Sequence, residues 1–437
     1  MLVAGVVQTW FTQVLFADGS YFLVRISDSR WFVLDSGRQI GNVLTQFPTV
    51  FAIRLFGIHS YHALAILLGV GFFVLPTALC AVALWIARRD IVVFWFVAIA
   101  TSALLLLGFG DLGAQFATHV FILMASILMV RTQLRRWHIG ILLALGIVTF
   151  ASYQSFVLLA PALLAMLVFR QRRGQFPMHK YSALFLAIEL ICSLAYNVYL
   201  LVSGHVTGST NTLIAGATNW NFFTSEEHVR IIFLLAVILG VPLVITALSN
   251  MVAKRLSSLV STILSISLAV VSLILIASAN LWLEPRASFH LRGLIAGSVG
   301  VLGIAAIFMI GRRSSPKDTS WRIAPVVALI VVASLNACFV ATKWHDYQQQ
   351  FQTSMRTYES WVPVQQLSIN ESLVHNFNWS WTSDSLGIVL NSVPGRVGVR
   401  NAPGKDHSYS ELLRAINNYS AHPSLSTLPA TLRRYRW

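Results

Sequence analysis

Long apolar runs separated by short polar connections fill most of the first 341 positions of this chain. A helix that crosses a bilayer needs about 20 apolar residues, and fewer where neighbouring protein covers it. On this measure the pattern predicts about eleven membrane spans. They cover residues 2–17, 59–87, 91–109, 115–131, 138–151, 154–169, 181–203, 229–251, 257–279, 291–311 and 323–341. We therefore expect an all-α polytopic membrane protein.

Composition supports this class, and the positions of the charged residues predict how the chain is oriented in the membrane. The 437 residues are 56% hydrophobic and only 11% charged, with a formal net charge of +15. Fifteen cations lie in five short connections that hold just two acids, Asp90 and Asp318. These cations are Arg88, Arg89, Arg131, Arg135, Arg136, Arg170, Arg172, Arg173, Lys180, Lys254, Arg255, Arg312, Arg313, Lys317 and Arg322. Short loops rich in Lys and Arg stay cytoplasmic, so the charge predicts a membrane topology and no nucleic-acid partner.

This topology places the amino terminus inside and the carboxyl terminus outside. We expect a bacterial inner (cytoplasmic) membrane, a transmembrane domain at 1–341 and a small extracytoplasmic, periplasmic module at 342–437. A first outward loop covers 18–58. The first span is short and no cation precedes it, so either neighbours hold it or Met1 lies downstream of the natural start.

The segment 138–169 has basic residues on both flanks, which must therefore lie on the same side. Its 32 residues form either two short helices that turn at Ser152–Ser155 or a re-entrant pair. Such short helices need protein neighbours rather than lipid.

Asp18 is the first polar residue after the first span, and a short run of apolar residues follows it. An aspartate in this place marks a helix start, and the run is too short and charged to cross a bilayer. We expect an interfacial helix whose aromatic side chains, among them Tyr21 and Phe22, enter the head-group layer. Asp18 itself is either a helix cap or a reactive acid at the membrane edge.

Five further polar residues are candidates because they lie on the outward side. Asp111 lies in a glycine-flanked turn, Arg38 lies in the first loop, and Arg286, His290 and Arg292 precede or begin the span at 291–311. The planar fork of arginine suits a phosphate, although arginines at a membrane edge also extend to the head groups for packing alone. For Asp111 the alternative is an ordinary turn residue.

Glu189 is the one acid well inside an apolar run. A charge there costs about 2.5–3.5 kcal/mol on insertion scales, so the residue either has a function or takes part in polar packing. Cys80, Cys192 and Cys338 all lie in apolar runs and indicate neither a disulfide nor a metal site.

An acid just after the first span, a long first outward loop, a pair of short spans between basic loops and an outward carboxyl-terminal module together resemble the GT-C superfamily of membrane glycosyltransferases. The resemblance covers the architecture of the whole chain and rests on one aspartate as its motif. It implies a polyprenyl-phosphate-linked sugar as donor, a glycan or lipid as acceptor, and membrane lipids as surroundings.

The resemblance also implies roles for single residues. Asp18 corresponds to the first-loop acid, which acts as the general base or helps to hold a divalent cation. Asp111 corresponds to a second-loop acid, and Arg286 to an arginine that binds the donor phosphate, with Arg38, Arg292 or His290 beside it. No other cofactor is implied. Gly19 follows Asp18 where protein mannosyltransferases have a second acid, and the oligosaccharyltransferase "WWD" motif is absent.

Three other functions remain open on the sequence. An O-antigen ligase or polymerase would also need outward arginines, but such enzymes carry their main soluble loop between late spans. A lipid-linked-sugar transporter or flippase would use Glu189, although the spans show no paired repeats and no interior Lys or Arg. A non-catalytic assembly subunit is the third.

Overall fold

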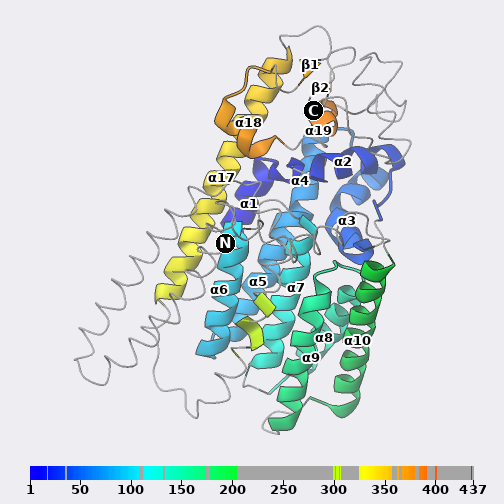
Figure 1. Ribbon diagram of the computed structural model, residues 1–437, viewed down its shortest axis with the longest axis vertical. Coiled ribbons are helices and arrows are strands. Elements are labelled where there is room, and N and C mark those ends of the chain that lie inside the picture. Colours follow the sequence, from blue (N-terminus) through cyan, green and yellow to red (C-terminus); the bar gives the residue numbers. More distant parts are fainter. Residues whose placement is uncertain are drawn as a thin grey trace, which may run out of the picture.

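The computed structural model of this chain is mostly helical, which confirms the predicted fold class at that level (Figure 1). It describes residues 1–16, 18–34, 37–107, 112–130, 133–173, 178–203, 299–300, 302–304, 306, 324–356, 362–363, 367–378, 383–390, 399–400 and 435. The predicted spans at 229–251 and 257–279, and most of 291–311, lie outside these residues.

From α4 to α10 the described helices follow the predicted runs closely. The elements are α1 (Leu2–Trp10), η1 (Gln13–Leu15), α2 (Asp18–Ser29), α3 (Gln39–Phe56), α4 (Tyr61–Gly69), η2 (Val70–Val74), α5 (Leu75–Ala87), α6 (Ile91–Leu107), α7 (Leu112–Met129), α8 (Arg136–Thr149), α9 (Phe156–Arg173), α10 (Lys180–Val202), α17 (Ala324–Arg356), α18 (Glu371–Phe377) and α19 (Ser383–Leu390). The two-residue strands β1 (Val362–Pro363) and β2 (Val399–Arg400) pair in parallel.

Helices α5 to α10, with the first turns of α17, form a bundle with its own apolar core. α4, η2 and α5 join without a break into one helix, Tyr61–Ala87. By length and composition, two helices of the described residues can cross a membrane: Tyr61–Ala87 and Lys180–Val202. Shorter apolar helices cover Ile91–Leu105, Phe116–Met129 and Arg136–Thr149.

The connections that carry Arg88, Arg89, Arg135 and Arg136 alternate with the α8–α9 turn along the chain, so they lie at the opposite end of the bundle, the lower end in Figure 1. We call this the basic end. Arg170 of α9 has a structural role there, because its Nη1 donates to the carbonyl oxygens of Leu128 (3.0 Å) and Val130 (2.8 Å). It thereby binds carbonyls at the end of α7 that have no partner within that helix.

The other end of the molecule is a head, which α2, η1, the last turns of α17, α18 and α19 form around a second core that also includes residues of α3, α4 and η2. Trp344, Tyr347, Phe351 and Phe377 pack there with ring centroids 5.5–5.9 Å apart for their neighbouring pairs. The predicted domain boundary at 341 falls inside α17, which continues for 15 residues beyond it to Arg356. α17 therefore belongs to the bundle at its start and to the head at its end.

The first 58 residues differ most from expectation. α1 ends at Trp10, and Thr12 follows with a positive φ of 49°. The indole Nε1 of Trp344 donates to the Thr12 carbonyl at 3.1 Å, which fastens this turn to α17. α2 does begin at Asp18 as predicted. The prediction that Tyr21 and Phe22 enter the head-group layer is wrong, because both are buried against protein.

Candidate functional site

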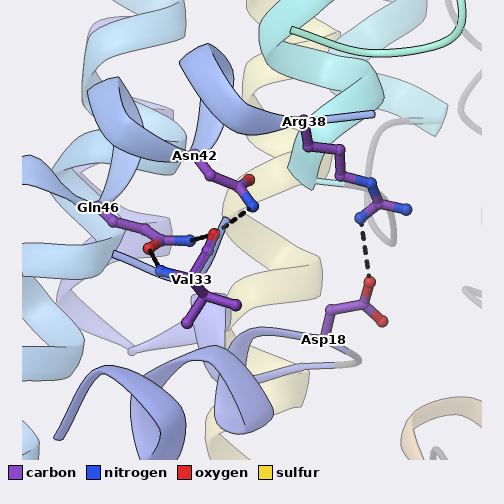
Figure 2. A network of polar contacts seen from close by, with 5 residues as sticks. All are labelled: Asp18, Val33, Arg38, Asn42 and Gln46. Atoms are coloured by element: carbon purple, nitrogen blue, oxygen red, sulfur yellow. Dashed lines mark hydrogen bonds and ion pairs between the residues drawn. The ribbon is translucent and has the colours of Figure 1, made fainter. Parts of the chain in front are cut away.

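Asp18 lies in the first turn of α2, where the helix macrodipole favours a negative charge. Its carboxyl Oδ2 lies 3.4 Å from Nη1 of Arg38. Both side chains keep 17% of their surface exposed, so the pair is largely but not fully removed from solvent. The sequence singled out these two residues separately, and the fold brings them together (Figure 2).

Arg38 is the N-cap residue of α3. Its guanidinium lies 4.9 Å from the centre of the Tyr153 ring, a distance at which a cation is attracted to an aromatic face. Tyr153 belongs to the turn between α8 and α9. The guanidinium thus contacts both a carboxylate from α2 and an aromatic ring from a turn more than 100 residues later in the chain.

The start of α3 lies directly against this α8–α9 turn. The backbone N–H of Ile40 donates to the carbonyl of Ala151 at 3.0 Å, and Gly41 lies against the backbone of Ser152. Gly37 leaves room for the side-chain amide of Gln154, which a Cβ at position 37 would meet. The turn that the sequence predicted at Ser152–Ser155 therefore forms one wall of the site.

Two amides of α3 hold the segment that leads to Arg38 (Figure 2). Asn42 Nδ2 donates to the Val33 carbonyl at 2.8 Å, and the Val33 N–H donates to Gln46 Oε1 at 2.8 Å. Gln46 Nε2 also lies 3.4 Å from the Val33 carbonyl. These bonds satisfy both backbone groups of a buried residue, which otherwise costs about 1–3 kcal/mol for each group left unpaired.

The chemistry available at this site is that of a carboxylate and a guanidinium with an aromatic neighbour. A partly exposed carboxylate such as that of Asp18 can accept a proton from a hydroxyl group. A guanidinium has five N–H donors in a planar fork, a geometry that suits an anionic ligand. Sequence reasoning missed Tyr153, Gln154, Asn42 and Gln46. The predicted topology places the first loop and the α8–α9 turn on the same, outward side. This was the one sequence signal that could have indicated contact between residues of the two segments.

The remaining candidates can be placed only in part. Asp111, Arg286, His290 and Arg292 lie outside the described residues. Within the described part of the chain, no group of three or more His, Cys, Asp or Glu side chains is arranged to hold a metal ion.

Glu189 lies where α10 packs against α8. Its two carboxyl oxygens are buried and have no hydrogen-bond partner within the described structure. Gly146 of α8 makes room for them, because a Cβ there would clash with the carboxyl group. One helical turn further along α10, Ser193 Oγ donates to the Thr149 carbonyl at 2.8 Å. Glu189 is thus part of a polar seam between two apolar helices.

Comparisons of the chain with protein-family models, with curated proteins and with solved structures give no match.

Proposed function

We propose that this protein is an integral membrane glycosyltransferase, similar to the GT-C superfamily, that transfers a sugar from a polyprenyl-phosphate donor to an envelope glycan or lipid. The observation that carries the proposal is the pairing of Asp18 with Arg38 at 3.4 Å in the head half of the molecule. A base and a phosphate-binding cation within one site are what such a transfer needs.

The membrane class has separate support. The bundle contains two helices of sufficient length and apolar character to cross a bilayer and several shorter ones. Its cations gather at the basic end, which the positive-inside rule assigns to the cytoplasm. On this assignment the head lies outside, and the chain is a multi-pass protein of a bacterial inner membrane.

The proposed reaction is a single displacement with inversion at the anomeric carbon. Asp18 accepts the proton of the acceptor hydroxyl as its oxygen forms a bond to the anomeric carbon. The bond from that carbon to the phosphate oxygen breaks, and polyprenyl phosphate leaves with the electron pair. Arg38 stabilises the charge that develops on the phosphate. Arg286, Arg292 and His290 are proposed to assist it, and Asp111 to contact the acceptor.

Substitution Asp18→Asn tests this function in membranes supplied with polyprenyl-phosphate-linked glucose, mannose or galactose. We expect transfer to fall by about 10²–10⁴-fold, the usual contribution of a positioned base. Asp28→Asn is the matched control, since Asp28 is a half-buried aspartate at the other end of the same helix. Full transfer by a folded and inserted Asp18→Asn variant would contradict the proposal.

Glu189 favours a second candidate, a transporter of lipid-linked sugars. A carboxyl group with both oxygens buried and unpaired in a helix seam suits a site that takes up and releases a proton or cation. Ion-coupled uptake into proteoliposomes that is abolished by Glu189→Gln would favour this function over transfer. If Glu189→Gln leaves sugar transfer unchanged, the residue has a packing role.

A further inference from the structure

The polarity of α3 is reversed relative to a helix that faces water. Its four polar residues on the inner side are almost fully buried, with 0–2% of their surface exposed. They are Asn42, Thr45, Gln46 and Thr49. Four large apolar side chains on the outer side are 38–65% exposed. They are Leu44, Phe47, Phe51 and Leu55, and we call them the α3 outer face.

The inner polar groups find their partners within the protein. Thr45 Oγ1 donates to the Gly41 carbonyl at 2.8 Å, and Thr49 Oγ1 lies 3.4 Å from the Leu64 carbonyl of α4. Asn42 and Gln46 bind the backbone of Val33, as described above. These residues thus have a structural reason to face inward, and the apolar residues at spacings of three and four are left on the opposite side.

Water does not favour such an arrangement. Single exposed apolar residues are ordinary, but a continuous apolar stripe on a helix marks contact with another apolar phase. We propose that the α3 outer face contacts the hydrocarbon chains of membrane lipids. The proposal rests on the membrane class in the proposed function, and it differs from the expectation that residues 18–58 form an extracytoplasmic loop.

Two other helices have exposed stripes of the same kind. In α10 these are Leu184, Ile188 and Ile191, and in α17 they are Val331, Leu335 and Phe339. Three separate apolar stripes agree with one surrounding hydrocarbon phase better than with three protein partners. Near the carboxyl end of α3, the Arg54 guanidinium lies 4.1 Å from the centre of the half-exposed Trp31 ring. Tryptophan is enriched at the membrane–water boundary.

This surface has a consequence for the site, because Arg38 is the N-cap of the same helix. A lipid on the α3 outer face would contact the same helix that carries Arg38 at its amino-terminal end. A lipid-linked donor can then approach sideways from the membrane, with its phosphate next to Arg38.

Site-directed spin labelling of the full chain in phospholipid nanodiscs tests the contact. Phe51→Cys, in a background with Cys80→Ala, Cys192→Ala and Cys338→Ala, carries the nitroxide. Native Cys192, which is exposed on α10, is the reference for a lipid-facing position in the Cys80→Ala, Cys338→Ala background. Gln349→Cys on the head part of α17 is the water-facing control. If Phe51→Cys does not fold, Leu55→Cys on the same face replaces it.

We expect the ratio of collisions with molecular oxygen to collisions with a nickel chelate at Phe51→Cys to match that at Cys192. It should exceed the ratio at Gln349→Cys by about tenfold, because oxygen is apolar and the chelate stays in water. A high nickel collision rate at Phe51→Cys overturns the proposal, and so do low rates for both reagents, which mean a protein cover. If Cys192 also shows a high nickel collision rate, the membrane class itself is wrong. If only Phe51→Cys does so, the membrane class stands and only the lipid contact of α3 is wrong.

Discussion

α2 and α3 follow each other in the first 58 residues, and both are amphipathic, but they turn opposite faces to the protein. α2 buries Phe22 and Ile26 in the head core. α3 buries Gln46 beside Val50 and Ile53, and it exposes Phe51. Helical periodicity therefore reveals that a helix has two faces, while the surrounding medium decides which of them is turned inward.

The largest expected effect distinguishes the two phenylalanines. Phe22→Ala should lower the free energy of unfolding by about 3–5 kcal/mol, because it leaves a cavity between α2 and η2 where Phe22 stacks on Phe72. Phe51→Ala should change it by less than about 0.5 kcal/mol. Chemical unfolding in one detergent measures both, and equal losses would remove the contrast between the helices.

A smaller effect is expected from the inner face of α3. Gln46→Ala leaves the buried N–H of Val33 without its acceptor and should cost about 1–3 kcal/mol. Gln39→Ala is the control, since Gln39 is exposed at the start of the same helix. Unfolding curves for the two variants compare them directly. A polar face turned to water would tolerate both substitutions equally.

The smallest effect concerns the contact that joins this region to the bundle. Tyr153→Leu removes the aromatic face beside Arg38 and should cost about 0.5–2 kcal/mol. A double-mutant cycle with Arg38→Gln isolates the pair, and a coupling energy of zero would mean that the ring only fills space. Binding of undecaprenyl phosphate in nanodiscs gives a second readout, which should weaken in Tyr153→Leu if the ring positions the guanidinium.

The sequence predicted the bundle well because apolar runs of about 20 residues have few other interpretations. It placed α5 to α10 within a few residues and found the short α8–α9 pair from its basic flanks. It missed α3 because the polar residues Asn42, Thr45, Gln46 and Thr49, together with Pro48, are typical of a loop when an aqueous surface is assumed. It also stopped the last bundle helix at 341, although Trp344, Tyr347 and Phe351 continue the helical spacing.

The candidate site was predicted only as separate residues. Asp18 and Arg38 each had a local signal, namely a helix start after an apolar run and a cation on the outward side. Their contact with Tyr153 is tertiary and leaves no trace in the local pattern, since it joins the start of α3 to a turn between two later helices.

The unbroken course of α17 has a mechanical consequence. Its 33 residues form a rod of about 50 Å that belongs to the bundle at one end and to the head at the other. A rod without a joint transmits tilt, so the head and the lower part of α17 can only turn together. On the proposed function, a lipid-linked donor would therefore have to reach the head by its own diffusion, because α17 has no hinge at residue 341 that would let the head move toward it.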